Sequence, residues 1–400
     1  MTRKIAVLTT SRADYSHLYW PWRDLAAHPE VDLRIIVIGS HLSPEFGNTV
    51  QEIEKDGFRI DARIECLLSS DTDVGMAKTI GVATLSLADA LGQMRPDLLL
   101  LIADRYELLA PASVALALRI PIAHIEGGEI SAGAIDDAVR NAVTKMSHIH
   151  FTGTESARRR VIAMGEEEWR VHRTGVPSLD HLRRQTLFTH EQLESHLKLD
   201  LARPTTLVVY HPVTLLRDTT QEADALFAAL ELLPEQILFC YPNADAGSRA
   251  LIERTRDFLS DGCRGHLFVN LDSLTYWSLL QQVDLLLGNS SSGIMETPSF
   301  ALPTVNIGLR QEGRERARNI LDCPPNTQAI LEKIRVARTA EFRESLQGMT
   351  NHYGDGHASE KIVQVLTTVP LSPELLIKYP SSARKGGAEA PPFQRREAAL

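Results

Sequence analysis

The stretch VDLLLGNSSSGIME, residues 283–296, predicts a buried apolar strand that runs into a glycine- and serine-rich loop and then opens a helix. This order of elements is typical of a unit that holds a nucleotide diphosphate, because the main-chain N–H groups at the helix start, here those of residues 290–293, have no partner within the helix. The helix dipole also favours an anion at that end. Serine-rich turns of the same kind cap helices that bind no ligand, so the stretch alone leaves both interpretations open.

Short β-rich runs alternate with longer helical patterns on both sides of this stretch, which is typical of repeated βαβ units. The runs are almost continuously apolar, as expected for a parallel sheet whose two faces are covered by helices. In the first half of the chain they are IAVLTT (5–10), LRIIVIGS (33–40), DLLLLIAD (97–104), IPIAHIEGG (120–128) and HIHFTGT (148–154). In the second half they are TTLVVYHP (205–212), QILFCYPN (236–243), HLFVNLD (266–272), VDLLLGN (283–289) and PTVNIG (303–308). The sequence therefore predicts two α/β domains, with ligands bound beyond the carboxyl ends of the strands.

The domain boundary is expected near Leu182, at the start of a charged, helical segment. Residues 1–181 then form the first domain and residues 182–356 the second. An amphipathic helix at about residues 357–378 is expected to pack back on the first domain. From residue 379 the chain is rich in proline, glycine and charge, with little to bury, so this tail is expected to be disordered.

Composition argues against several classes of partner. With 42 lysine and arginine residues against 51 aspartate and glutamate residues, the net charge is −9, and the surface has no basic footprint for nucleic acid or an anionic membrane. Cys66, Cys240, Cys263 and Cys323 show neither a CxxC pair nor metal-ligand spacing, which indicates a reducing compartment and no metal site. The N-terminal apolar run is too short for a signal peptide, and no segment is expected to approach transmembrane length. We therefore expect a cytoplasmic protein.

Several carboxylates follow predicted strands or open a predicted helix, and they should meet at one edge of the first sheet. Each has a simpler explanation alone, because an acid at a helix start is normally a cap or a partner of the helix dipole. Like charges crowded in a cleft cost energy unless they have a task, and their repulsion raises some pKa values, so that one cluster supplies both an acid and a base. The members are Asp104, Glu126, Glu129, Asp136 and Asp137.

Arginines in loops after strands are candidates for binding phosphate, whose oxygens match the planar guanidinium fork. Arg12 and Arg310 closely follow apolar strands, whereas Arg314 and Arg316 are more simply explained as part of a solvated loop. His211 ends a strand of the second half and either faces the acids across a cleft or is structural. The chain has no Walker lysine loop and no GxGxxG after its first strand, which disfavours ATP hydrolysis and dinucleotide redox chemistry.

An ordered set of motifs carries a resemblance to a known family. The motifs are SRADYSHL (11–18), ADR (103–105), HIEGGEISAGAIDDAVRNAVTKMSHIHFTGT (124–154), TGVPSLD (174–180), YHPVT (210–214), YPNADAG (241–247), GNSSSGIMETP (288–298) and NIGLRQEGRERARN (306–319). Over roughly residues 3–370 the chain resembles the hydrolysing UDP-N-acetylglucosamine 2-epimerases of bacterial sialic acid synthesis. The resemblance implies a GT-B-like pair of Rossmann-like, doubly wound domains, with the UDP-sugar in the interdomain cleft and no metal or cofactor. It also implies a homodimer or homotetramer.

The resemblance implies a reaction and a set of site residues. UDP-N-acetylglucosamine would lose UDP to give a 2-acetamidoglucal, and water would add to give N-acetylmannosamine. Three carboxylates share the proton transfers, and the resemblance does not say which is acid and which is base: Asp104, Glu126 and Asp136. His211 and Arg310 are placed at the diphosphate, together with Arg12, Ser16 and Arg105 of the first domain and Ser290, Ser291 and Gly293 of the second. Glu296 is placed at the ribose, and Asn243 and Tyr276 at the uridine.

Two positions depart from the family pattern. Arg140 is followed by Asn141 where the family usually has a histidine, so any proton-transfer or positioning role of that histidine is missing. His17 follows Ser16, where relatives carry lysine or another polar residue. The sugar preference therefore stays open, and the alternatives are UDP-2,4-diacetamido-2,4,6-trideoxyglucose or a GDP-linked sugar of legionaminic acid synthesis.

Three other functions compete with this one. A GT-B glycosyltransferase would use the same nucleotide cradle but needs an acceptor site and at most one catalytic base. A non-hydrolysing epimerase has a different acidic segment from EGGEISAGAIDD (126–137). A nucleotide-sugar sensor would keep the serines and arginines yet lose the acids, whereas Asp104, Glu126 and Asp136 are all present.

Overall fold

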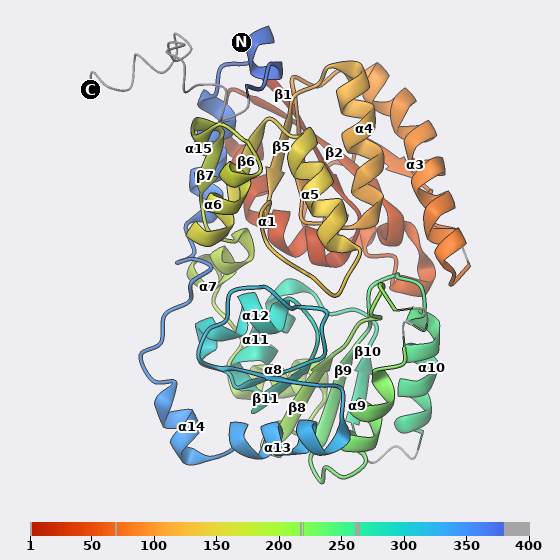
Figure 1. The fold of residues 1–400 in the computed structure, drawn as a ribbon, viewed down its shortest axis with the longest axis vertical. Coiled ribbons are helices and arrows are strands. Elements are labelled where there is room, and N and C mark those ends of the chain that lie inside the picture. Colours follow the sequence, from red (N-terminus) through yellow and green to blue (C-terminus); the bar gives the residue numbers. More distant parts are fainter. Residues whose placement is uncertain (1, 69, 217, 219, 261–264, 380–400) are drawn as a thin grey trace.

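Each half of the chain is built on its own parallel sheet, and the two α/β units lie one above the other in Figure 1. The computed structural model describes residues 2–68, 70–216, 218, 220–260 and 265–379. The sheet of the first domain has the strand order β3-β2-β1-β4-β5-β6-β7, with β1 (Arg3–Thr9), β2 (Val31–Ile38), β3 (Ala62–Ile64), β4 (Leu98–Ile102), β5 (Ile122–Ile125), β6 (Ile149–Thr152) and β7 (Val171–Arg173). The sheet of the second domain has the order β10-β9-β8-β11-β12-β13, with β8 (Thr205–Val209), β9 (Gln236–Cys240), β10 (Gly265–Phe268), β11 (Leu285–Gly288), β12 (Thr304–Ile307) and β13 (Ile320–Cys323). The prediction of two doubly wound α/β domains is confirmed.

Three strands were absent from the sequence prediction: β3, β7 and β13. All three are sheet edges of three or four residues, and each carries a polar or charged side chain within its short length. An edge strand has one paired neighbour and less cover, so it lacks the continuous apolar run by which the central strands were recognised.

Helices cover both faces of the first sheet because successive side chains of its strands point to opposite sides. Ile5 and Val7 of β1 pack with α1 (Arg12–Ala27), whereas Ala6 and Leu8 pack on the face covered by α3 (Asp73–Met94) and α4 (Leu109–Leu118). The remaining helices of this domain are α2 (Val50–Lys55), α5 (Asp136–Met146) and α6 (Glu155–Ala163). The segment toward and around the second sheet contains α7 (Asp180–Arg184), α8 (His190–Leu197), α9 (Ala223–Leu230), α10 (Ser248–Phe258), α11 (Ser273–Gln282), α12 (Ser292–Met295), α13 (Thr327–Ala337) and α14 (Ala340–Ser345).

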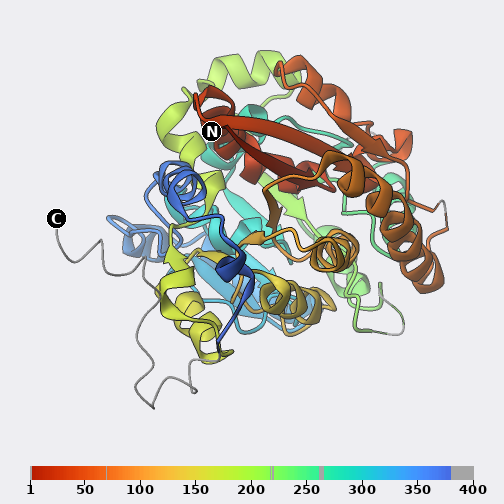
Figure 2. The same cartoon turned by 90° about the horizontal axis from the view of Figure 1, so that it is seen from above.

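Helix α15 (Ala358–Thr368) crosses back from the second domain and lies beside the first in both views (Figures 1 and 2). Its residues Ile362 and Leu366 are fully buried in the same core cluster as Trp22 of α1. The guanidinium of Arg3 donates hydrogen bonds to the carbonyls of Leu366 (2.9 Å) and Val369 (2.7 Å), which holds the end of the helix on β1. The tail that the sequence predicts to be disordered lies, beyond residue 379, outside the described residues.

The long helix α3 departs from the expectation that no segment approaches transmembrane length. Its 22 residues are long and apolar enough to cross a membrane by length and composition. Buried residues recur every fourth position along it, from Gly75 and Thr79 to Leu91, and they form the stripe that packs in the first domain, with Leu85 exposed on another face. The helix therefore belongs to the layered fold in this structure while keeping an unusually apolar outer face.

Leu366→Ala is expected to lower the free energy of unfolding by about 2–5 kcal/mol, because it leaves a cavity where α15 meets the core of the first domain. Gln364→Ala, on the exposed side of the same helix, is the matched control and should change it by less than about 0.5 kcal/mol. Urea unfolding followed by circular dichroism measures both. Equal stabilities of the two variants would contradict the role assigned to α15.

Candidate active site

A cavity that is partly open to solvent lies between the two domains, at the carboxyl ends of the central strands of both sheets. Clefts between domains are common sites for small-molecule ligands. Every residue that the sequence analysis assigns to the site lines this cavity, with the exception of Gly293. The first domain supplies Arg12, Ser16, Asp104, Arg105, Glu126 and Asp136, and the second supplies His211, Asn243, Tyr276, Ser290, Ser291, Glu296 and Arg310.

The serine loop differs from its prediction at Gly293. Helix α12 has only four residues and passes at once into a 3-10 turn at Thr297–Phe300 that contains Pro298. The N–H of Gly293 donates to the carbonyl of Ser290 (3.2 Å), and the N–H of Ser292 donates to the hydroxyl of Ser290 (3.3 Å). These two amides were expected to be unpaired, and the structure shows that both have a partner within the loop. A Cβ at Gly293 would lie 3.0 Å from side-chain atoms of the neighbouring strands, so this glycine serves packing. The loop presents the side chains of Ser290 and Ser291 to the cavity.

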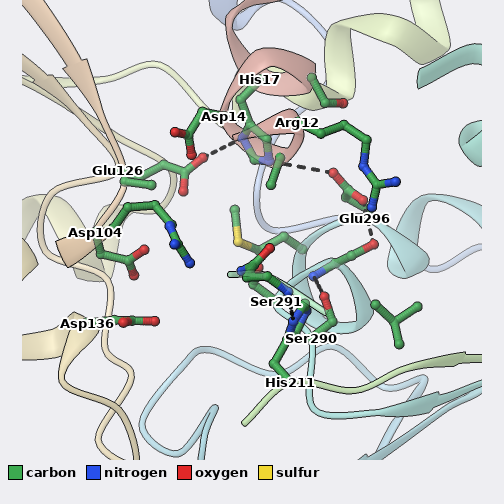
Figure 3. Close-up of a pocket in the computed structure, with 18 of the residues that line it drawn as sticks. Arg12, Asp14, His17, Asp104, Glu126, Asp136, His211, Ser290, Ser291 and Glu296 are labelled. Atoms are coloured by element: carbon green, nitrogen blue, oxygen red, sulfur yellow. Dashed lines mark hydrogen bonds and ion pairs between the residues drawn. The ribbon is translucent and has the colours of Figure 1, made fainter. Parts of the chain in front are cut away.

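Three carboxylates lie along one wall of the cavity: Asp104 after β4, Glu126 after β5 and Asp136 at the start of α5 (Figure 3). His211, Ser290 and Ser291 lie across from Asp104 and Asp136 in the same view. The wall forms because β4 and β5 are parallel neighbours, so that the residues following them reach the same edge of the sheet. The predicted convergence is therefore present for these three acids, whereas Glu129 and Asp137 of the predicted cluster do not line the cavity.

Arg140 holds the central acid in place. Its fully buried guanidinium forms an ion pair with Asp104 and donates to the carbonyl of Glu129 (2.8 Å) and the hydroxyl of Ser131 (3.0 Å). Asp104 is thereby tied to the loop that leads into α5, which begins at Asp136. Arg140 was not among the residues predicted for the site. The available signal was an arginine on the apolar side of an amphipathic helix, next to paired acids.

Acids and arginines pair across the two domains. Arg310 of the second domain lies 3.4 Å from Asp136 of the first, and Arg105 of the first domain lies 2.7 Å from Asp245 of the second. Arg314, which the sequence analysis places in a solvated loop, is instead buried, and its Nη2 lies 3.9 Å from the Asp104 carboxylate. Burial raises the pKa of Asp136, while Arg310 opposes that rise. The site is thus complete only when both domains contribute.

His17, on the same helix as Arg12 and Ser16, also lines the cavity, and the sequence analysis did not assign it to the site. Its Nδ1 lies 2.6 Å from an oxygen of Glu126, and its Nε2 lies 3.7 Å from an oxygen of Glu296 (Figure 3). Burial favours the neutral ring, but the charges of Glu126 and Glu296 outweigh it and raise the pKa of His17 to about 9. Burial likewise favours the neutral acid at Glu126, yet the ion pair with His17 lowers the pKa of that carboxyl.

His211 is held as a neutral donor. Burial, followed by the charge of Arg310, lowers its pKa well below the ordinary value. The ring accepts a hydrogen bond at Nδ1 from the backbone N–H of Asn243 (3.1 Å), which leaves the proton on Nε2. Its backbone N–H donates to the side chain of Asn289 (2.7 Å), which also donates to its carbonyl (2.9 Å). A fixed, uncharged N–H donor in a phosphate cradle suits an anionic ligand.

A chain of hydroxyls joins the predicted uridine and ribose positions. The hydroxyls of Tyr276 and Ser292 are 2.6 Å apart, and Ser292 donates to a carboxylate oxygen of Glu296 (2.5 Å). Ser292 therefore orients the acid that is placed at the ribose, a function that the sequence analysis did not give it.

The comparisons with known proteins agree with one another. The family model described as UDP-N-acetylglucosamine 2-epimerase matches residues 23–367. The chain is 36% identical to the GDP/UDP-N,N'-diacetylbacillosamine 2-epimerase (hydrolyzing) of Campylobacter jejuni, over 86% of this chain and 89% of that protein. It is also 36% identical to the UDP-N,N'-diacetylbacillosamine 2-epimerase (hydrolyzing) of Legionella pneumophila, over 94% of this chain and 99% of that protein. The crystal structure of UDP-GlcNAc 2-epimerase from Neisseria meningitidis bound to UDP-GlcNAc has the same fold, with a TM-score of 0.76, 20% identity, and coverage of 91% of this chain and 99% of that one.

Gly133→Ala is expected to weaken UDP binding at least about tenfold, which is about 1.4 kcal/mol. A Cβ at Gly133 would lie 2.4 Å from the backbone of Leu309 and 2.7 Å from the nitrogen of Arg310, so the loop before Asp136 must move away from the second domain. Titration calorimetry with UDP measures the change.

Gly81→Ala on α3 is the control, because a Cβ there meets no atom within 4 Å. It should leave the affinity for UDP unchanged. Equal affinities of the Gly133→Ala variant and the native protein would show that the contact between this loop and Arg310 does not shape the site.

Proposed function

The chain belongs to the UDP-N-acetylglucosamine 2-epimerase family, with relatives named as hydrolysing enzymes, and we propose that its substrate is UDP-N,N'-diacetylbacillosamine, that is, UDP-2,4-diacetamido-2,4,6-trideoxyglucose. Two relatives of 36% identity carry this sugar in their names, which supports the proposal. UDP-N-acetylglucosamine, the first expectation from sequence, becomes the second candidate and is supported by the description of the family. The products are UDP and the free sugar of manno configuration.

The observation that carries this function is the row of carboxylates facing a diphosphate cradle in one cavity. Asp104, Glu126 and Asp136 form the row, and His211 and Arg310 belong to the cradle. A glycosyltransferase needs the cradle and at most one base, and a sensor needs no acids, so neither accounts for the cost of bringing three carboxylates together in one cavity. A reaction with a proton removal and a proton addition on the sugar uses such a set.

In the first step we assign the base to Glu126, because its ion pair with His17 keeps it as a carboxylate. It takes the proton from C2 of the sugar, the electron pair of that bond forms the C1–C2 double bond, and the bond between C1 and the UDP oxygen breaks. The departing diphosphate takes the electrons, and Arg310 and the N–H of His211 stabilise the charge that develops on it. The sugar becomes a 2-acetamidoglucal.

In the second step water adds across the double bond. We assign the acid to Asp136, because burial raises its pKa and thereby favours the protonated form that can give a proton to C2. Inversion at C2 requires that this proton arrive on the face opposite the one from which Glu126 removed its proton. Water adds its oxygen to C1 and loses a proton to the carboxylate of Asp104, which forms an ion pair with Arg140. These two steps leave one proton on Glu126 and one on Asp104. One of the two returns to Asp136 and the other is released to solvent, as hydrolysis of the UDP-sugar requires.

An NMR time course in deuterated water, with UDP-N,N'-diacetylbacillosamine and UDP-N-acetylglucosamine in separate tubes, tests the proposal. The expected result is free UDP and a manno sugar deuterated at C2, formed faster from the diacetamido substrate. Faster turnover of UDP-N-acetylglucosamine would reverse the order of the two candidates. Epimerised sugar still attached to UDP would establish the non-hydrolysing reaction instead, and absence of turnover with both would favour the transferase or sensor.

Asp104→Asn and Glu126→Gln should each lower kcat by roughly 100- to 10,000-fold while UDP binding stays within about threefold of the native protein. Both groups act on the sugar in the proposed mechanism, on the wall opposite the diphosphate cradle. Coupled detection of released UDP measures turnover, and calorimetry measures binding. Asp89→Asn, an exposed acid on α3, is the control for the charge change. Near-native rates in both site variants would overturn the assignment of the acids.

A further inference from the structure

His17 lies between the two domains and exchanges no proton with the sugar in the proposed mechanism. It lies on α1 of the first domain, and its ring reaches Glu126 of the same domain on one side and Glu296 of the second domain on the other (Figure 3). The contact with Glu126 is a close ion pair of 2.6 Å, whereas the distance of 3.7 Å to Glu296 allows charge attraction without a short hydrogen bond. One side chain thus connects a proposed catalytic acid with the acid placed at the ribose.

The first turns of α1 hold His17 rigidly. Ser11 caps the helix, and its hydroxyl accepts from the N–H of Asp14. The carboxylate of Asp14 accepts from the N–H (2.9 Å) and the hydroxyl (2.6 Å) of Thr10, which anchors the helix start to the end of β1. The carbonyl of Ser16 accepts a hydrogen bond from the ring of His181 (2.9 Å) on α7, so the backbone next to His17 is also fixed. A ring carried on such a support can set the orientation of a partner.

The charges around the ring favour the imidazolium. Glu126, Glu296 and Asp14 all raise the pKa of His17, and His181 is a neighbouring imidazole whose own pKa burial lowers. Around Glu126, Arg314 is the second cation after His17. Without the imidazolium, burial would dominate at Glu126 and favour its neutral, protonated form, which cannot accept a proton from the sugar.

We propose that His17 is a positioning residue that keeps Glu126 ionised and aligned for removal of the C2 proton, and that links this acid to Glu296 of the nucleotide-binding domain. The proposal rests on the proposed function for the reaction that Glu126 serves. The pairing of His17 with Glu126 itself does not depend on which sugar is turned over. His17 does not touch the reacting atoms in this role, and its effect passes through the two carboxylates.

The kinetic test compares His17→Gln with His17→Lys, the second of which keeps a cation at this position. For His17→Gln we expect kcat at pH 7 to fall about 10- to 100-fold, with KM within about threefold, because proton transfer rather than substrate binding is affected. The native profile of kcat against pH should decline above about pH 9 as the imidazolium loses its proton, and this limb should be absent in His17→Gln. His17→Lys should retain more turnover at pH 7 than His17→Gln.

Three kinetic results would overturn the proposal. They are a kcat of His17→Gln within twofold of the native value, a reduced kcat with the native alkaline limb still present, and a lower kcat for His17→Lys than for His17→Gln. A loss of activity that came only from disturbed folding would not remove one limb of the pH profile, so the profile separates positioning from a structural role.

The second test needs no substrate. Protein labelled with ¹⁵N in its histidines is titrated by NMR from pH 6 to 10, and the signal of His17 is identified by its absence in His17→Gln. The expected midpoint is near pH 9 in the native protein and lower in Glu126→Gln, because the charge of Glu126 that raises the pKa of the ring most is then absent while burial still lowers it. A native midpoint at or below about 6.5 overturns the pairing.

The two tests also separate this proposal from the proposed function. If no nucleotide sugar is turned over but the NMR midpoint is near pH 9 and falls in Glu126→Gln, the reaction is wrong and the His17–Glu126 pair stands. If turnover is found but the titration is that of an ordinary histidine, the reaction stands and the role of His17 is overturned.

Discussion

The pairing of carboxylates with buried arginines from the opposite domain is the interaction on which the site depends. Arg310 reaches Asp136, Arg105 reaches Asp245, and Arg314 approaches Asp104. Removing one partner from a buried pair leaves an uncompensated charge, which costs several kcal/mol. Each domain therefore stabilises the acids or cations of the other, and the relative placement of the domains is coupled to the ionisation of the site.

This coupling has a consequence for an anionic ligand. A diphosphate that enters the cavity meets Arg105, which already pairs with Asp245, and Arg310, which already lies 3.4 Å from Asp136, so its affinity is reduced by the interactions that these arginines give up. The neutral His211 adds a donor without adding a charge that would need a further partner. Affinity for the nucleotide is thus moderated by the acids that the chemistry requires, which favours release of UDP after the reaction.

The sequence predicted the main architecture and most of the site because both rest on local patterns with one physical meaning. Apolar runs of about five residues separated by helical patterns fold as a parallel sheet, and residues after neighbouring strands meet at the same edge, which brought Asp104 and Glu126 together. The sequence missed β3, β7 and β13, whose short edge strands lack that pattern. The predictions for Arg314 and Gly293 were also wrong. A loop arginine such as Arg314 is buried only if another domain covers it. A glycine that follows serines, such as Gly293, has the same local sequence whether it faces a ligand or a strand.

What the sequence determined by itself is the class of chain: two α/β domains, acids at the strand ends of the first, and a serine loop with histidine and arginine in the second. These features follow from periodicity and from residue types that act within a few positions of one another. Only the tertiary structure decided which charges pair, since Arg140 with Asp104 and His17 with Glu126 and Glu296 are contacts between residues far apart in the chain. The ionisation of each acid depends on burial and on those partners, and neither is a property of the residue's neighbours in sequence.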